Sequence, residues 1–511
     1  MVAQHYNHSV PAFAMMDFED SNTDRDNEND EFVFLLVATQ CIINNNLAWI
    51  HYLRRRRRRT QQRLRIMRVV EEILLPPDHR HLPRQQRAVF RHHEALICIK
   101  RDYFGIPGDL GTPIFKDQTF QMMFRLSRSR VQRLFEDIMT TNHPFYANSM
   151  DAYGKKGASL ESKVLLPLKT FAYGVPPHTF TDYFQMSKGL AATCCDEFAA
   201  TMKLLYDEEY LRIPSTADLN MIITLHKERH GVNGMFGSLD CMHNGWKNCP
   251  KAWQASFKTG KESGGPTVVL EALCDYNLWF WHASFGYAGS LNDLNILNLS
   301  PFLESLVDGT FSELERSCGK APYEISGSIF HRFFALVDGI YPPYSRFVKG
   351  IQMPLTDEEK RYTAWQEAAR KDIERAFGVL QSRFQVMSRP FLGHCLKKIS
   401  TVVSACLIMH NMCVSDRIME GNVYARYNPA NNVMEDKVDV VIENENGAET
   451  AMPTQIGLAN ADHANVIDNV LARQNHWREV NDATEHARLH SALRDLKGTS
   501  QGRTIDNTLL L

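Results

Sequence analysis

The stretch Met235-Phe-Gly-Ser-Leu-Asp-Cys-Met-His243 decides how the middle of this chain folds. Its short apolar run predicts a buried β-strand, with Asp240 near its centre. A carboxylate in a core strand is costly to bury unless it is paired or binds a metal. Two interpretations follow: Asp240 caps a neighbouring loop, or it belongs to a site that it shares with other charged groups.

Three further acidic residues, Asp293, Asp338 and Glu374, lie in sequence contexts of their own. Asp338 follows the apolar run 334–337, which predicts another strand. Glu374 flanks the apolar stripe of a predicted helix over 357–386. If several of these carboxylates converge, they form a hard, oxygen-lined site of the kind that Mg²⁺ or Mn²⁺ prefers.

Two of these acids also have an ordinary structural explanation. Ser290-Leu-Asn-Asp293 matches the Ser-x-x-Asp pattern, in which Asp293 closes a variant capping box of the next helix. Glu374 has Arg370 four residues back and Lys371 three residues back, both at the spacing of a surface ion pair on a helix. At the level of sequence both explanations stay open.

The fold class indicated by the periodicity is α/β, preceded by a helical region. Residues 231–415 carry strand-like runs at 235–242, 266–274, 278–285 and 334–340, with helical patterns at 293–306, 357–386 and 397–413. Strands that alternate with helices predict a mixed α/β layer. The tripeptide Asp275-Tyr-Asn277 predicts a hairpin turn between the second and third strands.

Residues 115–230 are predicted to be a helical domain. A short helix over 179–186, a turn, and a longer helix over 190–206 are the parts of a helix-turn-helix. DNA binding by this segment and plain packing in a helical bundle are both compatible with the pattern. Outside these two regions we expect a partly disordered N-terminal region at 1–110, a linker at 416–462 and a C-terminal helical tail at 463–511.

Charge distribution is more informative than total charge. The chain has 57 basic and 59 acidic residues, which give a net charge of −2 and exclude nothing about its partners. Residues 17–31 are acidic, whereas 54–68 hold arginines and no acid. The arginine block is a candidate nuclear import signal, a nucleic-acid patch or a solvated, partly disordered arm, and it favours a nuclear location. Its core consists of Arg54, Arg55, Arg56, Arg57, Arg58 and Arg59.

Cysteine usage and hydropathy favour a reducing compartment without a membrane partner. The eleven cysteines are scattered and form no Cys-x-x-Cys pair. The first thirty residues are polar and acidic, unlike a signal peptide. The apolar run 32–43 is too short to span a bilayer.

Longer motifs give a more specific indication. On these motifs, in this order and spacing, residues 115–415 resemble the PIF/Harbinger class of DDE transposases. The motifs are Gly237-Ser-Leu-Asp-Cys-Met-His243, Trp246-Lys-Asn-Cys-Pro250, Trp279-Phe-Trp-His282, Gly286-Tyr-Ala-Gly-Ser-Leu-Asn-Asp-Leu-Asn-Ile-Leu297, Val337-Asp-Gly-Ile-Tyr-Pro342, Arg370-Lys-Asp-Ile-Glu-Arg-Ala-Phe-Gly-Val-Leu-Gln381 and Leu407-Ile-Met-His-Asn-Met412.

The resemblance implies a ribonuclease-H-like core with a mixed five-stranded sheet and flanking helices. It implies catalytic acids on the first strand (Asp240), on the fourth strand (Asp338) and on a following helix (Glu374). Asp293 falls on a fourth acidic position of the family pattern, as a metal ligand or a structural cap. The implied cofactor is a pair of Mg²⁺ or Mn²⁺ ions, with Asp240 bridging both.

The implied activity is that of a metal-dependent DNA endonuclease and strand transferase, which cuts transposon ends and joins them to a target. Its partners would be terminal-repeat and target DNA and a Myb-like DNA-binding protein, with a homo-oligomer left open. Lys247, Lys258, Lys371 and Arg375 are candidate phosphate contacts or ordinary solvated cations. Two alternatives remain: a domesticated, non-catalytic DNA-binding protein, and a host nuclease on the same fold.

Overall fold

The computed structural model describes residues 89–105, 111–147, 150, 154, 156–258, 264–420, 426–428, 433–435 and 473–499. The described residues from Phe90 onward form one compact unit. The acidic tract, the arginine block Arg54–Arg59 and most of the predicted linker lie outside the described residues.

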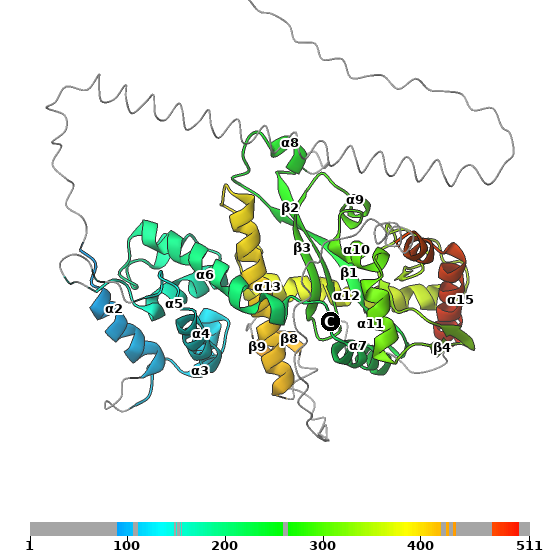
Figure 1. The fold of residues 1–511 in the computed structure, drawn as a ribbon, viewed down its shortest axis with the longest axis horizontal. Coiled ribbons are helices and arrows are strands. Elements are labelled where there is room, and N and C mark those ends of the chain that lie inside the picture. The colour runs from blue at the N-terminus through cyan, green and yellow to red at the C-terminus, as the bar shows by residue number, and fades with distance from the viewer. Residues whose placement is uncertain are drawn as a thin grey trace, which may run out of the picture. The chain divides into compact units, whose positions relative to one another are not determined.

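A mixed five-stranded sheet lies at the centre of this unit (Figure 1). The strand order is β3-β2-β1-β6-β7. β1 pairs with β2, and β2 with β3, in antiparallel fashion, whereas β1–β6 and β6–β7 are parallel. The expected mixed sheet with flanking helices is therefore confirmed. Its strands are β1 (Met235–Gly245), β2 (Thr267–Cys274), β3 (Phe280–Ala288), β6 (Phe334–Leu336) and β7 (Phe347–Val348).

The β2–β3 hairpin is tied to a long core helix, α13 (Leu396–Met419). The side chain of Asn411 accepts a hydrogen bond from the Phe280 amide at 3.0 Å and donates one to the Phe280 carbonyl at 2.9 Å. The neighbouring His410 donates from Nε2 to the Leu278 carbonyl at 2.8 Å. Because a buried backbone group must be paired, these two side chains fix where β3 begins. The His-Asn pair of the 407–412 motif therefore has a structural role.

Helices occupy most of the region before β1. Four of them begin at a serine N-cap, Ser127, Ser159, Ser187 or Ser215, whose side chain accepts a bond from the amide three residues ahead. The elements are α2 (His92–Ile99), the π-helix η2 (Lys100–Phe104), α3 (Asp117–Phe124), α4 (Arg128–Thr140), α5 (Leu160–Tyr173), the 3₁₀ helix η3 (Pro177–Phe180), α6 (Lys188–Tyr210) and α7 (Thr216–His230).

The prediction of a short helix over 179–186 is wrong. The 3₁₀ helix η3 ends at Phe180, and turns follow it up to α6. Gln185 has a left-handed φ of +49°, which an α-helix cannot accommodate. The longer helix is present as α6, but Phe198 and Met202 on it are fully buried in the core.

The helices after the sheet's first three strands also differ in detail from the sequence pattern. The single helix expected over 293–306 is two helices, since Ser300 caps a new N-terminus and Pro301 occupies its first turn. β6 ends at Leu336, before the expected 340. The remaining elements are α8 (Gln254–Phe257), α9 (Asp293–Leu297), α10 (Pro301–Val307), α11 (Thr310–Cys318), β4 (Tyr323–Ile325), β5 (Ser328–Phe330), α12 (Asp357–Arg383), β8 (Arg426–Asn428), β9 (Val433–Glu435) and α15 (Ala483–Thr499).

Two apolar cores cover the two faces of the sheet. One joins α3–α6 and α13 to the face that carries Ala272 and Phe280. The other packs α7, α10, α11 and α15 on the face that carries Leu239 and Leu273. By length and composition α13 is also the one helix in the described ranges that could cross a membrane, and 61% of its apolar window is buried inside the protein. Its apolar residues here form core contacts.

Candidate metal centre

The sheet brings two of the four predicted acids to the same level. In the parallel β1–β6 pair, Ser238 lies opposite Leu336. Two residues further along each chain are Asp240 and Asp338, and strands of a parallel pair advance together by nearly equal rises. Asp240 lies within β1, whereas Asp338 is the exposed second residue after β6.

Asp240 is an incompletely compensated carboxylate. Its side chain is 19% exposed. Oδ1 accepts a hydrogen bond from the Cys241 amide at 2.8 Å, and Oδ2 accepts one from Arg370 at 2.9 Å. The pKa of Asp240 is raised to about 6, mainly by burial and to a smaller extent by the charges of Asp293 and Asp338, while the Cys241 amide and Arg370 lower it. The partners of the Asp240 side chain are thus its neighbouring amide and an arginine of α12, and Asp240 does not cap a loop.

One guanidinium connects Asp240 to Glu374. Arg370 on α12 contacts Asp240 through Nη1 and Glu374 through Nη2, the latter at 2.8 Å. Glu374 therefore forms the helical ion pair that its sequence context allowed. The arginine is only 17% exposed and reaches the sheet, so the pair is more than a surface contact. The first and last predicted acids lie on the same side of the molecule, one arginine apart.

Asp293 does not cap its helix. The N-cap of α9 is Asn292, whose side chain accepts from the Asn295 amide at 2.9 Å, and Asp293 is the first helical residue. The capping-box explanation for Asp293 is therefore wrong. Burial raises the pKa of Asp293, the charge of Asp338 adds to this, and the Cys241 thiol and His243 oppose it. Asp293 thus shares an electrostatic environment with Asp338 and Asp240.

Sequence reasoning missed two neighbours of these acids. The Cys241 thiol lies 3.6 Å from the Tyr341 hydroxyl and also hydrogen-bonds Asp293. Burial raises the pKa of both Cys241 and Tyr341, which keeps both groups neutral at physiological pH. Cys241 directly follows Asp240 and Tyr341 comes three residues after Asp338, but only the fold shows that they meet.

The donor set suits a hard divalent cation. All four predicted ligands are carboxylates, the donor type that Mg²⁺ and Mn²⁺ prefer. Arg370 holds one oxygen of Asp240 and one of Glu374. A cation shared by these two acids therefore competes with Arg370. Tested against the residues present, the site fits Mg²⁺ or Mn²⁺, on condition that the arginine yields these oxygens.

Two histidines and an aspartate form another group of possible metal ligands. Within the described part of the chain, the group whose ligand atoms all lie within 4.8 Å of one another is His226, His230 and Asp372. His226 donates from Nδ1 to the Met235 carbonyl at 2.9 Å, and its Nε2 accepts from the Tyr276 amide at 3.0 Å. A metal at His226 would leave a buried amide unpaired. The trio is therefore a structural hydrogen-bond network.

The predicted phosphate contacts are not all beside the acids. Lys247 and Lys258 are exposed on the connection between β1 and β2, and Lys371 is exposed on α12. Arg375 pairs with Asp372 and lies over the Tyr276 ring at 5.3 Å, so the structure places it at the β2–β3 turn.

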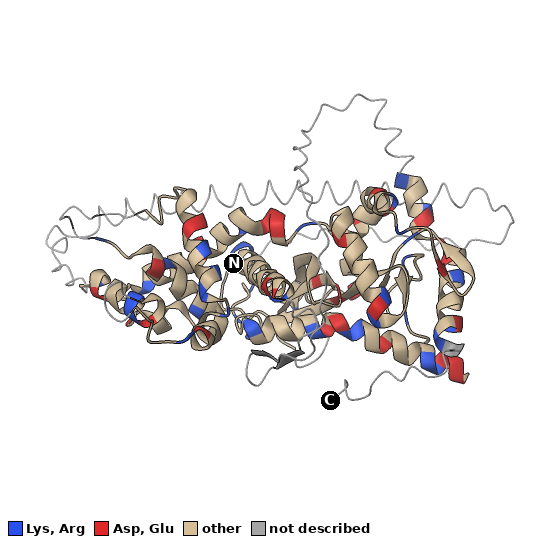
Figure 2. Ribbon diagram, turned by 90° about the horizontal axis from the view of Figure 1, so that it is seen from below, with Lys and Arg blue, Asp and Glu red and all other residues tan. Residues whose placement is uncertain are grey.

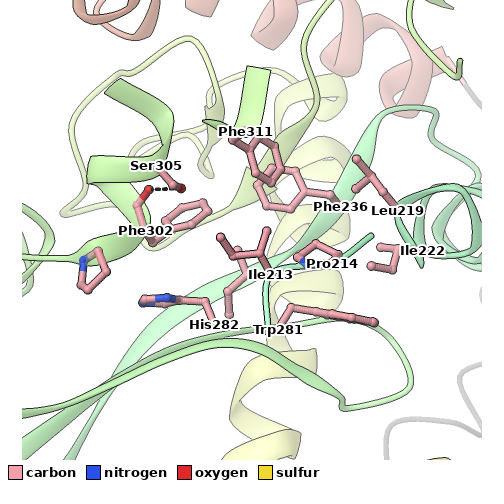
Figure 3. Close-up of a pocket in the computed structure, with 12 residues that line it drawn as sticks. Ile213, Pro214, Leu219, Ile222, Phe236, Trp281, His282, Phe302, Ser305 and Phe311 are labelled. Atoms are coloured by element: carbon pink, nitrogen blue, oxygen red, sulfur yellow. Dashed lines mark hydrogen bonds between the residues drawn. The ribbon is translucent and has the colours of Figure 1, made fainter. Parts of the chain in front are cut away.

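An apolar cavity of about 110 Å³ lies on the second core's side of the sheet (Figure 3). Its lining includes Phe236 and Trp281 from the sheet and Phe302 and Phe311 from α10 and α11. Leu273 also lines it and pairs across the strands with Leu239, whereas Asp240 pairs with Ala272 on the opposite face. The cavity is therefore separate from the acids.

Comparison with known proteins agrees with the motif order. Residues 208–421 match the family described as plant transposon protein. The chain is also similar to "Protein ALP1-like" of Arabidopsis thaliana, with 21% identity over 304 residues that cover 58% of this chain and 71% of that protein. No solved structure matches the chain. The matched family region contains β1, β6, α9 and α12, and so all four acids.

Proposed function

Through residues 208–421 this chain belongs to the plant transposon protein family, and we propose on that premise that it is a DDE transposase. In this proposal it cuts DNA at transposon ends and joins the freed 3′-hydroxyl to target DNA. The observation that carries the proposal is the Arg370 bridge between Asp240 and Glu374, with Asp338 two residues beyond the end of β6, the strand that pairs with β1.

The proposal includes a ribonuclease-H-like arrangement of the core. In chain order, β1 is the first strand of the five-stranded sheet, β6 is the fourth, and α12 follows the fifth. Asp240, Asp338 and Glu374 lie on or directly after these three elements. Such a placement supports the roles that the resemblance implied, because residues distant in sequence reach one end of one sheet.

The residues of the chain then have distinct tasks. Asp240, Asp338, Asp293 and Glu374 would hold the divalent cations, Mg²⁺ or Mn²⁺. When bound, such ions act as Lewis acids at the phosphodiester and lower the pKa of the attacking water or hydroxyl. When no ion is bound, Arg370 lies between Asp240 and Glu374 and offsets their negative charge through an ion pair with each. Most of what remains in phosphoryl transfer is positioning of the DNA.

In both steps an oxygen nucleophile loses its proton to solvent and attacks phosphorus, the P–O3′ bond breaks, and the 3′ oxygen leaves with the bonding pair and is protonated to a 3′-hydroxyl. In cleavage the nucleophile is water and in joining it is the freed 3′-hydroxyl. Proposed phosphate contacts are Lys247, Lys258, Lys371 and Arg375. The wider proposal includes a nuclear location, set by the arginine block, a Myb-like partner protein and no membrane association.

The test uses the full chain, Mg²⁺ or Mn²⁺, and labelled DNA with the terminal repeats that flank the gene. We expect wild-type protein to nick this DNA and Asp240→Ala and Glu374→Ala to lose nicking. Asp357→Ala is the matched control, because this acid on the same α12 helix is 83% exposed and pairs only with Lys360 three residues on. Equal nicking by wild type, Asp240→Ala and Glu374→Ala would refute the catalytic assignment.

A strand-transfer assay separates the alternatives. A transposase joins the cut end to a second DNA, whereas a host nuclease on the same fold cuts without joining. A domesticated DNA-binding protein binds the repeats and does neither. The presence of all four acids in the chain favours a cutting enzyme over the last alternative.

A further inference from the structure

The connection between β1 and β2 is cationic and carries an exposed tryptophan. Between Cys241 and Lys258 the sequence contains three lysines and no acid. Elsewhere in the described residues, acidic and basic side chains are interspersed along the helices (Figure 2). Residues 251–256 are all exposed, and Trp253 among them is 36% exposed. Tryptophan with one buried side and one side in solvent is a residue type enriched at interfaces.

This segment is held rigidly against the core. The Trp246 amide donates to the Pro266 carbonyl at 2.7 Å, and its indole donates to the Gly393 carbonyl at 2.7 Å. The Asn248 side chain donates to the Leu392 carbonyl at 2.7 Å. The residues before the exposed part are therefore bonded to the turn before α13, and Lys258 after it is bridged to Pro266.

Trp253 itself is supported from one side by aromatic rings. Its ring is stacked with Phe257, with centroids 6.2 Å apart and planes 23° apart, and lies 6.0 Å from Trp246. Both supporting rings are buried. The Trp253 indole is therefore preorganised while part of it still faces solvent, so a planar partner can stack on it without first ordering the side chain.

The same segment adjoins the acids. Ser290 donates from Oγ to the Ser256 carbonyl in α8 at 2.6 Å, and Asp293 follows Ser290 by three residues. His243, at the start of the acid-free stretch, acts on the charge of Asp293. Figure 1 shows α8 at the same end of the sheet as α9. The exposed ring and its lysines thus lie beside the candidate metal centre.

We propose that residues 246–258 form a DNA-binding surface next to the scissile phosphate, where Trp253 stacks on an unpaired base at the transposon end. Lys247, Lys251 and Lys258 would neutralise the flanking phosphates, which supplies affinity without sequence choice. Base–aromatic stacking tolerates any base and fits a strand that is opened for cutting. This inference rests on the proposed function, because it names the DNA structure which that site receives.

The experiment measures binding in EDTA, so that no cleavage occurs, with the full chain and forked DNA that carries 2-aminopurine at the unpaired positions. We expect wild-type protein to change the 2-aminopurine fluorescence at one unpaired position. Trp253→Ala should abolish this change and weaken binding about tenfold to a hundredfold, as loss of one stacked base implies. Trp253→Phe keeps a ring and should retain most of both signals.

Ile329→Ala is the control, because Ile329 is a 55% exposed apolar residue on β5, away from every proposed DNA contact, and its loss should leave both signals unchanged. Thermal unfolding of each variant checks that the fold is intact. Lys251→Gln should weaken binding to forked and blunt duplexes alike and reduce its salt dependence.

Unchanged fluorescence and affinity in a folded Trp253→Ala variant would overturn the inference. Binding of wild type to anionic vesicles in preference to forked DNA, lost in Trp253→Ala, would overturn it in favour of a membrane surface. The two proposals can fail separately. If wild type cuts DNA, and the Trp253→Ala variant binds forked DNA and changes its fluorescence as wild type does, only the stacking role is refuted. A chain that stacks a base through Trp253 but never cuts refutes only the catalysis.

Discussion

Replacing Asp240 with asparagine should stabilise the metal-free protein while it abolishes activity. Burial is the main reason that the pKa of Asp240 rises from 3.8 to about 6. The folded state therefore binds this proton more tightly than the unfolded state does. As the pH rises through this interval the folded form loses stability relative to the unfolded form, and above about 6 the loss is complete.

The size of the effect follows from the shift. A difference of about two pKa units corresponds to about 3 kcal/mol at most, at about 1.4 kcal/mol per unit. Asparagine keeps an acceptor for the Cys241 amide but gives up the ion pair with Arg370. We therefore expect Asp240→Asn to gain about 1–3 kcal/mol at pH 7.5 and nothing near pH 3.5.

The assay is urea unfolding of both proteins between pH 3.5 and 8 in EDTA, followed by tryptophan fluorescence. The control Asp357→Asn, at a highly exposed position, should change stability by less than about 0.5 kcal/mol. If the proposed metal site is correct, added Mg²⁺ should stabilise wild type and leave Asp240→Asn unchanged, because an ion that binds only the folded wild type stabilises that state. A variant that is less stable than wild type at pH 7.5 in EDTA would contradict the reasoning.

Three further predictions follow from other contacts. Arg370→Met should lower the free energy of unfolding by about 2–4 kcal/mol in EDTA, since two carboxylates lose a shared partner. Mg²⁺ should recover more stability in this variant than in wild type, and urea midpoints with and without the ion check this. Glu315→Ala should cost about 3–5 kcal/mol by leaving the buried Arg346 unpaired, and adding Arg346→Met should restore much of it, which a double-mutant cycle measures. His226 is fully buried and its pKa is lowered to about 4. Its contribution to stability is therefore complete above pH 6.5 and is lost as the pH falls toward 4. The slope of the unfolding free energy against pH in this interval should be smaller in His226→Asn.

Much of the sheet could be predicted from local pattern. β1, β2 and β3 appear where short apolar runs placed them, and the Asp275–Asn277 turn joins the last two. Predictions failed where a single residue's backbone mattered. Pro301 divides the helix expected over 293–306, and Gln185 ends the helical geometry expected through 186. Hydropathy averages over several residues and does not register such local interruptions.

The candidate site shows the same division. Sequence context alone left Asp293 open between a helix cap and a metal ligand, and Glu374 open between a surface ion pair and a metal ligand. The structure assigns the cap to Asn292 instead, and it shows that the partner of Glu374 is the arginine that also holds Asp240. Neither distinction is available from spacing, because both competing partners stand at suitable intervals along the chain.

What the amino-acid sequence determined by itself is the identity and order of the chemical groups: four carboxylates in four specific motifs, a cationic stretch with a tryptophan, and the strands that carry them. Tertiary structure alone decided which groups meet. The parallel pairing of β1 with β6 aligns Asp240 and Asp338, about a hundred residues apart, and the reach of Arg370 from α12 adds Glu374. The physical reason is that a carboxylate's charge is tuned by neighbours within a few ångströms in space, which local sequence patterns do not specify.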